Sequence, residues 1–411
     1  MIRQINIRQL VHALSDALDL VGLDEDQHGK RVAFMARNCA ENLGWDGSRL
    51  ERLYNAALVH DCGVSSTEVH RRLTTELDWD GSQDHCLRGE RLLDRCSLFR
   101  DLAPVIRYHH THWEDLPADL DRETALAANL VYLADRADAL LCQNAHQDIL
   151  MARHRICDTL SKYRDSFFDS GLVDAFLDAA GNEFFWLAMD SRHLFRYLIQ
   201  MEQGSSAETA DPQTLLEVAG LFADIVDTKS TFTHEHSKGV ARLARLLGSF
   251  QNLSEDTLAD LEIAGLLHDL GKLNVPDEIL EKAGPLNESE RAVMLHHSFE
   301  SFQILNRIEG FSEIAQWAAF HHEDMSGTGY PFRKNRNSLS PEARIIAVAD
   351  VFQALAQERP YRGALPPEKI LPILKDMVQS GKLDPDLVAL VEARPDACWR
   401  SAVGAGAEGT V

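Results

Sequence analysis

The chain has 411 residues, 45% of them hydrophobic, and a formal net charge of −23, so its length suits about two domains, each with a core of its own. The negative charge excludes a broad basic face for a nucleic-acid polymer, because binding to phosphates requires clustered Lys and Arg. The seven cysteines form no CxxC pair, and their odd number favours reduced thiols in a soluble, cytoplasmic protein. No apolar stretch reaches the ~18 residues of a membrane span.

Apolar residues at helical spacing dominate the chain. The pattern is clear in LEIAGLLHDLGK (residues 261–272) and ARIIAVADVFQAL (343–355), whereas sustained strand-like alternation is scarce. The polar segment GSSAETADP (204–212) ends in a proline that suits the start of a helix. We therefore predict an all-α protein with one domain at 1–203, a linker, a second domain at 211–395 and a disordered tail at 396–411.

Histidine and aspartate residues recur in the same order in the two halves of the chain. The first set comprises His28, His60, Asp61, His85, His109, His110 and Asp135. The second set comprises His236, His268, Asp269, His297, His321, His322 and Asp350. The separation is 208 residues for the first histidine and the His-Asp pair, 212 for the next three histidines and 215 for the last aspartate. This spacing predicts duplicated domains.

Seven such side chains are too many for one tetrahedral ion, and they fit two metal ions that share a carboxylate. Imidazole nitrogens and carboxylate oxygens are ligands that suit first-row transition metals. Isolated histidines such as His12, His193 and His296 are expected to be ordinary hydrogen-bonded or surface residues. His297 is preferred to His296 as a ligand because it keeps the register with His85.

Three segments of the second half resemble the HD-GYP phosphodiesterases, a branch of the HD metal-dependent phosphohydrolases that cleave cyclic dinucleotides. They are HDLGK (268–272), HHEDMSGTGYP (321–331) and ADVFQALAQERPYR (349–362). The resemblance covers roughly residues 211–395, and the first half resembles an HD domain only. It implies two tandem HD-type helical bundles.

The resemblance also implies a role for each residue of the second set. Asp269 would bridge two divalent transition metal ions, iron or manganese. One ion would take His236, His268 and Asp350, and the other would take His297, His321 and His322. Together the ions would hold a phosphodiester and activate a water for in-line attack. The family usually has Asp at Ser326 and Arg at Gly239, and a three-metal subset has Glu at Phe232, so we expect two ions here.

Four further residues would handle the substrate. With Asp269, Lys272 is the predicted catalytic residue, stabilising charge on the phosphate, although it could be simply a helix C-terminal cation. The resemblance places Tyr330, Arg359 and Arg362 against the substrate, where guanidinium groups can pair with phosphate or a guanine edge. The two arginines would otherwise be solvated surface charges.

The first half lacks this substrate-handling set. In register, Val64, Ala118, Asn144 and Gln147 stand where the second half has Lys272, Tyr330, Arg359 and Arg362. We therefore expect a degenerate HD-like domain with a regulatory or structural role. The question whether this domain holds a second metal site stays open.

The expected activity is hydrolysis of a bacterial cyclic dinucleotide, cyclic di-GMP first and 3',3'-cyclic GMP-AMP second, to a linear dinucleotide or mononucleotides. Two alternatives stay open. The first is a catalytically inactive, metal-containing signalling or interaction protein, and the second is a general nucleotide phosphohydrolase. A homodimer or a signalling-protein partner also stays open.

Overall fold

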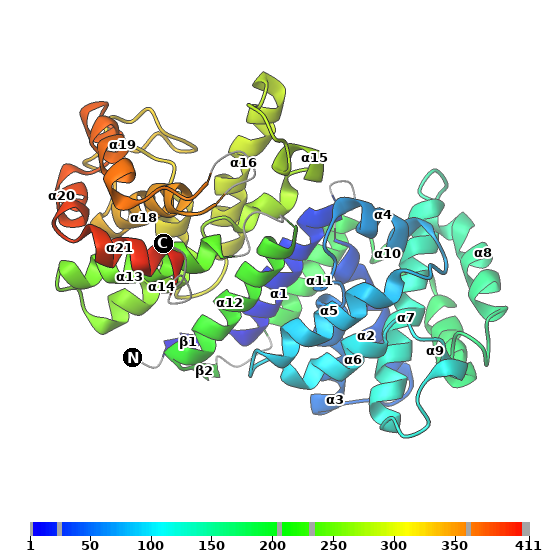
Figure 1. The fold of residues 1–411 in the computed structure, drawn as a ribbon. Coiled ribbons are helices and arrows are strands. Elements are labelled where there is room, and N and C mark those ends of the chain that lie inside the picture. The colour runs from blue at the N-terminus through cyan, green and yellow to red at the C-terminus, as the bar shows by residue number, and fades with distance from the viewer. Residues whose placement is uncertain (1–2, 23–26, 204–207, 230–234, 359–362, 405–411) are drawn as a thin grey trace. The chain divides into compact units, whose positions relative to one another are not determined.

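The computed structural model describes residues 3–22, 27–203, 208–229, 235–358 and 363–404 (Figure 1). The chain forms two compact units, one of residues 7–206 and one of residues 207–411 with residues 1–6. The all-α prediction is confirmed: in the described part, strands occur only as a two-stranded antiparallel ribbon, β1 (Arg3–Ile5) with β2 (Glu208–Ala210). Strand β1 belongs to the C-terminal unit, although we had assigned its residues to the first domain, 1–203.

The N-terminal unit is built around one long helix, α7, which packs against α2, α4, α6 and α8. Its elements are α1 (Ile7–Asp19), η1 (Leu20–Gly22), α2 (His28–Asn42), α3 (Gly47–Leu58), α4 (Thr67–Thr75), α5 (Ser82–Asp94), η2 (Arg100–Leu102), α6 (Ala103–Tyr108), η3 (Trp113–Asp115), α7 (Arg122–Gln143), α8 (Ile149–Ser161), α9 (Ser170–Ala180), α10 (Glu183–Leu187) and α11 (Ser191–Gln203). Helix α7 is buried along most of its length, yet it carries Asp135, Arg136 and Asp138. Buried charges require partners, so this helix marks a polar centre inside the unit.

The C-terminal unit is organised around α13, which packs against α14, α18 and α21. Its helices are α12 (Pro212–Lys229), α13 (His236–Phe250), α14 (Glu255–Leu267), η4 (Leu270–Asn274), α15 (Asp277–Leu280), α16 (Glu288–Leu305), α17 (Ser312–Ala319), α18 (Pro341–Ala356), α19 (Pro367–Gln379), α20 (Pro385–Ala393) and α21 (Pro395–Val403).

Local sequence signals set the starts of the helices that carry candidate ligands. Ser254 caps α14, and Ser340 caps α18 directly before Pro341. Asn287 and Glu290 form a reciprocal capping box at the start of α16. These caps fix the beginning of each helix and therefore the face on which its ligand residue lies.

The prediction of a disordered tail at residues 396–411 was wrong for residues 396–403. These residues lie in α21, where Cys398 and Ala402 are buried and the Trp399 indole donates a hydrogen bond to the carbonyl oxygen of Leu365. The small residues there pack against α13, which a count of large apolar residues does not reveal. Residues 405–411 lie outside the described residues.

All seven cysteines are free thiols. Among the described residues, no helix is both long and apolar enough to span a membrane.

Candidate metal centre

The seven predicted ligands of the C-terminal unit come from five places in the fold and meet at one centre. His236 begins α13, His268 and Asp269 follow α14, His297 lies on α16, His321 and His322 follow α17, and Asp350 lies on α18. Three groups of potential metal-binding atoms result, with the atoms of each group within 4.8 Å of one another, and the third, of His268, Asp269 and His321, joins the other two. The first group is His236, His268 and Asp350, and the second is His297, His321 and His322. They coincide with the two sets of ligands that the resemblance implies.

Asp269 lies between the two groups. Its Oδ2 atom is 3.3 Å from His268 Nε2 and 3.6 Å from His236 Nε2. Its Oδ1 atom is 3.6 Å from His297 Nε2 and 3.8 Å from His321 Nε2. One oxygen therefore faces each group, as a bridging carboxylate requires.

Second partners fix the orientation of four imidazoles. The Nδ1–H groups of His268, His297 and His321 donate to the carbonyl oxygens of Gly265, Met294 and Ala318, at 2.8, 2.6 and 2.6 Å. His236 Nδ1 donates to the side-chain oxygen of Gln353 at 2.5 Å. Because Nδ1 carries the proton, each Nε2 lone pair is left to face the centre.

This arrangement fits a metal ion better than a network of hydrogen bonds. His297 Nε2 and His321 Nε2 lie 3.3 Å apart although neither carries a proton to share. His268 Nε2 is buried and has no hydrogen-bond partner among the described residues. Buried polar atoms are normally paired, so acceptor atoms that converge in this way indicate a cation between them.

The protonation states agree with such a site. Burial lowers the pKa of His297 to about 3 and that of His322 to about 4, so both imidazoles are neutral at pH 7. Burial by itself would raise the pKa of Asp269, but His268 and Lys272 hold it well below the usual carboxyl value. His268 differs in the metal-free protein, because burial alone would lower its pKa but Asp269 raises it. Neutral His297 and His322 with an ionised Asp269 are donors of the kind that a divalent cation binds.

Lys272 lies at the edge of this centre. It belongs to the 3-10 turn η4, and its Nζ atom is 2.5 Å from Asp269 Oδ2. Its side chain keeps 22% of its surface exposed, so the ammonium group can also reach a ligand from solvent. The contact with Asp269 is compatible with the predicted role.

The loop that follows His322 is held by two carboxylates that the sequence analysis did not assign. Glu323 accepts hydrogen bonds from the backbone N–H groups of Phe332 and Lys334, at 2.6 and 2.8 Å. Asp324 accepts from the backbone and hydroxyl groups of Ser326 and Thr328. The serine that departs from the family pattern is therefore part of the loop's own scaffold.

Tyr330 is placed by that loop against the second ligand group. Its ring stacks on His322, with 4.7 Å between centroids, and lies 6.3 Å from the ring of His297. Gly329 permits this approach, because a Cβ atom there would lie 2.5 Å from the carbonyl oxygen of His322. Arg359, Arg362 and Phe232 lie outside the described residues.

The histidines that we expected to be ordinary lie away from both centres. His12 is buried and contacts the Tyr54 hydroxyl at 3.1 Å, while His193 and His296 are exposed.

The predicted first-half residues also come together. His28, His60 and Asp61 form one group of potential metal-binding atoms, and His28 Nε2 lies 3.4 Å from Asp135 Oδ1. His85 Nε2 lies 3.1 Å from His109 Nε2 and 3.4 Å from Asp61 Oδ1. His110 Nε2 lies 3.4 Å from Asp135 Oδ2. The two halves thus assemble equivalent sets of side chains.

Comparison with known proteins agrees with this duplication. Models of the HD domain match residues 220–387 and residues 26–140. Over 387 residues the chain is 36% identical to the 3'3'-cGAMP-specific phosphodiesterase 1 of Vibrio cholerae, which covers 92% of this chain and 90% of that protein. This chain belongs to the HD-GYP family.

Two other known proteins are similar to this HD-GYP protein. A cyclic di-GMP phosphodiesterase of Thermotoga maritima is 32% identical over 177 residues, 42% of this chain and 47% of that protein. A crystal structure of a cyclic GMP-AMP-specific phosphodiesterase of V. cholerae has a TM-score of 0.65 at 23% identity and covers 95% of this chain and 97% of that one. The second likeness confirms the fold of tandem HD domains.

The two HD domains differ in the side chains that surround their ligand residues. Asp138 accepts a hydrogen bond from His28 Nδ1 at 2.7 Å, where the HD-GYP domain uses the neutral Gln353. The buried Arg136 donates to Asp135 Oδ2 at 2.7 Å, where the register places Val351 in the HD-GYP domain. The N-terminal HD domain therefore already contains a cation that pairs with one of its candidate ligands.

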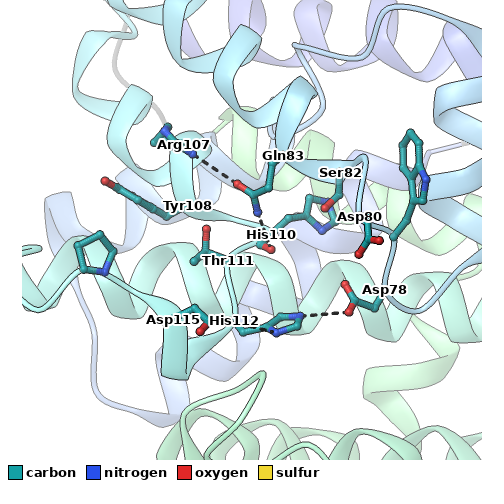
Figure 2. Close-up of a pocket in the computed structure, with 12 residues that line it drawn as sticks. Asp78, Asp80, Ser82, Gln83, Arg107, Tyr108, His110, Thr111, His112 and Asp115 are labelled. Atoms are coloured by element: carbon teal, nitrogen blue, oxygen red, sulfur yellow. Dashed lines mark hydrogen bonds and ion pairs between the residues drawn. The ribbon is translucent and has the colours of Figure 1, made fainter.

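A cavity of about 480 Å³ adjoins the N-terminal cluster (Figure 2). His110 lines it, and Gln83 donates to the carbonyl oxygen of His110 at 2.9 Å while its own amide oxygen is 3.4 Å from Arg107 Nη1. Its carboxylates are those of Asp78, Asp80 and Asp115. This acidic lining contrasts with the cations that we predict around the C-terminal substrate.

Proposed function

We propose that the C-terminal HD-GYP domain hydrolyses a phosphodiester bond of a bacterial cyclic dinucleotide to give a linear dinucleotide, mononucleotides or both. The observation that carries this proposal is the pair of ligand groups that share Asp269. Two adjacent ions suit phosphodiester hydrolysis because they can act on both the attacking and the leaving oxygen.

The names of the relatives support an order in which to propose substrates. The relative that matches over 92% of the chain is named for 3'3'-cGAMP, whereas the cyclic di-GMP phosphodiesterase of T. maritima matches over 42%. We therefore place 3',3'-cGAMP first and cyclic di-GMP second, which reverses the order expected from the sequence.

Two divalent transition metal ions, iron or manganese, are the proposed cofactors. His236, His268 and Asp350 would hold one ion, His297, His321 and His322 the other, and Asp269 both. When bound, the ions would neutralise charge on the phosphodiester and lower the pKa of a water toward ~7. The backbone carbonyls behind His268, His297 and His321 keep the imidazoles in the tautomer that can bind them.

Residues beside the ions would handle the substrate. The exposed part of Lys272 lets its ammonium group move from Asp269 to a phosphate oxygen, where charge develops during the reaction. Tyr330, which stacks on His322, offers an aromatic face and a hydroxyl group beside the same ion. We assign Arg359 and Arg362 to phosphate or base recognition on the strength of the family motif.

A comparative turnover assay tests this function. The full chain is loaded with Fe²⁺ or Mn²⁺ under reducing conditions, its metal content is measured, and the same sample is offered 3',3'-cGAMP, cyclic di-GMP and mononucleotides. We expect linear products from a cyclic dinucleotide, abolished in His297→Ala and retained in His296→Ala, which changes the exposed neighbour. If the metal-loaded protein hydrolyses neither the cyclic dinucleotides nor the mononucleotides, the result would instead support the hypothesis of a catalytically inactive signalling protein. Phosphate release from mononucleotides alone would support a general phosphohydrolase.

A further inference from the structure

We propose that the N-terminal HD domain binds a single thiophilic metal ion, zinc by preference, through His85, Cys86 and His109, with Asp61 as fourth ligand. This site differs from the C-terminal centre in its ligand chemistry and in the number of ions. It also does not depend on the activity proposed for the HD-GYP domain.

Cys86 introduces sulfur into one side of the N-terminal cluster. It lies on α5, is fully buried, and its Sγ atom is 3.9 Å from His85 Nε2. Each of the three residues offers a ligand atom within 4.8 Å of the others. A thiolate is a soft ligand and favours zinc over manganese.

The C-terminal domain has no sulfur at this place. In the 212-residue register, Ser298 corresponds to Cys86, and its hydroxyl lies 3.1 Å from His297 Nε2. The same position therefore presents oxygen in one domain and sulfur in the other. This difference separates the metal preference of the two domains although their histidines and aspartates correspond.

The spacing of the donor atoms suits tetrahedral zinc. Zn–N bonds of about 2.05 Å and a Zn–S bond of about 2.3 Å imply N···N separations of ~3.4 Å and N···S separations of ~3.6 Å. The observed distances are 3.1 Å between His85 Nε2 and His109 Nε2, and 3.9 Å between His85 Nε2 and Cys86 Sγ. His85 Nε2 is 3.4 Å from Asp61 Oδ1. His85, Cys86 and His109 form one group of potential metal-binding atoms, and Asp61 would have to move toward Cys86 and His109 to complete the site.

Buried atoms without partners point to an ion on this side of the cluster. Asp61 Oδ1, which faces His85, is buried and makes no hydrogen bond among the described residues. The Nδ1–H group of His109 donates to the carbonyl oxygen of Ile106 at 2.7 Å, which leaves its Nε2 lone pair facing His85. An ion would satisfy acceptors that the protein itself leaves unpaired.

The other side of the cluster is already neutralised, and this limits the site to one ion. Arg136 donates two hydrogen bonds to Asp135 Oδ2, at 2.7 and 3.2 Å. Asp138 binds His28 Nδ1 and the guanidinium group of Arg31. A second dication near Asp135 would lie close to the fixed positive charge of Arg136, which disfavours it.

The cavity of Figure 2 is lined by neighbours of the proposed ligands. His110 and Ser82 line it, and the Ser82 carbonyl oxygen accepts the Cys86 S–H group at 3.4 Å. Binding of the ion would release this thiol proton, and the acidic lining of the cavity would attract a dication.

Cobalt loading of the full chain tests the sulfur ligand, because a thiolate on Co²⁺ gives a charge-transfer absorption band that nitrogen and oxygen ligands do not give. We expect this band in the wild type and in Asp269→Ala, in which the C-terminal centre is disrupted. It should be lost in Cys86→Ser, which copies Ser298, and retained in Cys157→Ser, which removes a partly exposed thiol of the same unit. No band in the wild type, or a band that survives Cys86→Ser, would overturn the proposal.

A second measurement keeps the test decisive if Cys86→Ser does not fold. X-ray absorption of zinc-loaded Asp269→Ala protein should show sulfur at about 2.3 Å from the zinc. The metal content of the same sample should be one zinc per chain. A coordination shell of nitrogen and oxygen alone would contradict the proposed site.

Discussion

Gln353 should control how tightly the C-terminal domain holds one of its ions. Its side-chain oxygen accepts a hydrogen bond from His236 Nδ1–H, and both side chains are buried. Gln353→Leu keeps a side chain of similar size but leaves that N–H group without an acceptor. A buried unsatisfied donor costs about 1–3 kcal/mol. Loss of such an outer partner of a metal-binding histidine typically lowers affinity about 10–100-fold, or about 1.4–2.7 kcal/mol, so the two estimates agree.

Chelator competition on the full-length protein would measure this effect. We expect the ion assigned to His236, His268 and Asp350 to be released at about 10–100-fold lower chelator concentration, while the other ion changes little. Turnover should recover when excess metal is added. Gln353→Glu should retain the ion, because a carboxylate still accepts the hydrogen bond, as Asp138 does for His28.

Gln303→Leu is the matched control, because Gln303 is an exposed residue of α16. Circular dichroism should show the same helical content in all variants. If folded Gln353→Leu protein keeps both ions with wild-type affinity, the hydrogen bond does not orient His236 and the reasoning is refuted.

Three further outcomes are expected. Asp269→Ala should abolish hydrolysis and lower the bound metal, because Asp269 faces both ligand groups; full activity would rule out a shared ligand. Arg359→Ala and Arg362→Ala should weaken substrate use more than tenfold with unchanged metal content, for a loss of about 1.5–3 kcal/mol per charged contact; a parallel loss of metal would show that these residues are misplaced. The metal-free protein should lose stability as the pH falls below ~6.5, because burial lowers the pKa of His297 to about 3 and only the unfolded chain then takes up that proton. Urea midpoints at pH 7 and pH 5 should differ less in His297→Gln than in the wild type or His296→Gln, and equal differences in all three would exclude this coupling.

The repeated spacing of His and Asp predicted which side chains gather because most of them lie at helix ends. A residue at the end of a packed helix keeps its direction when the helix is duplicated, so the sequence register carries over to space. The structure accordingly brings His268 and Asp269 to one end of α14 and His60 and Asp61 to the equivalent place after α3.

The residues that hydrogen-bond to the candidate metal-binding histidines could have been predicted from the same repeated spacing. Gln353 follows Asp350 by three residues, as Asp138 follows Asp135, and three residues is close to one helical turn. We did not predict them because a glutamine on an apolar helix has no recognisable metal-binding signature. Glu323 and Asp324 are a different case, because their role is to accept backbone N–H groups of a loop whose path only the structure reveals.

Charge compensation explains why equivalent ligand sets need not perform the same chemistry. In the C-terminal centre, Lys272 pairs with Asp269 and stays partly exposed, so its ammonium group remains within reach of solvent. In the N-terminal cluster, Arg136 is fully buried and is fixed by the carbonyl oxygens of Leu73 and Glu76 as well as by Asp135. An internal guanidinium group cannot leave when a substrate arrives. The N-terminal domain therefore combines side chains equivalent to the candidate metal ligands of the C-terminal domain with a permanent internal cation, and this combination suits a structural or regulatory site better than a catalytic one.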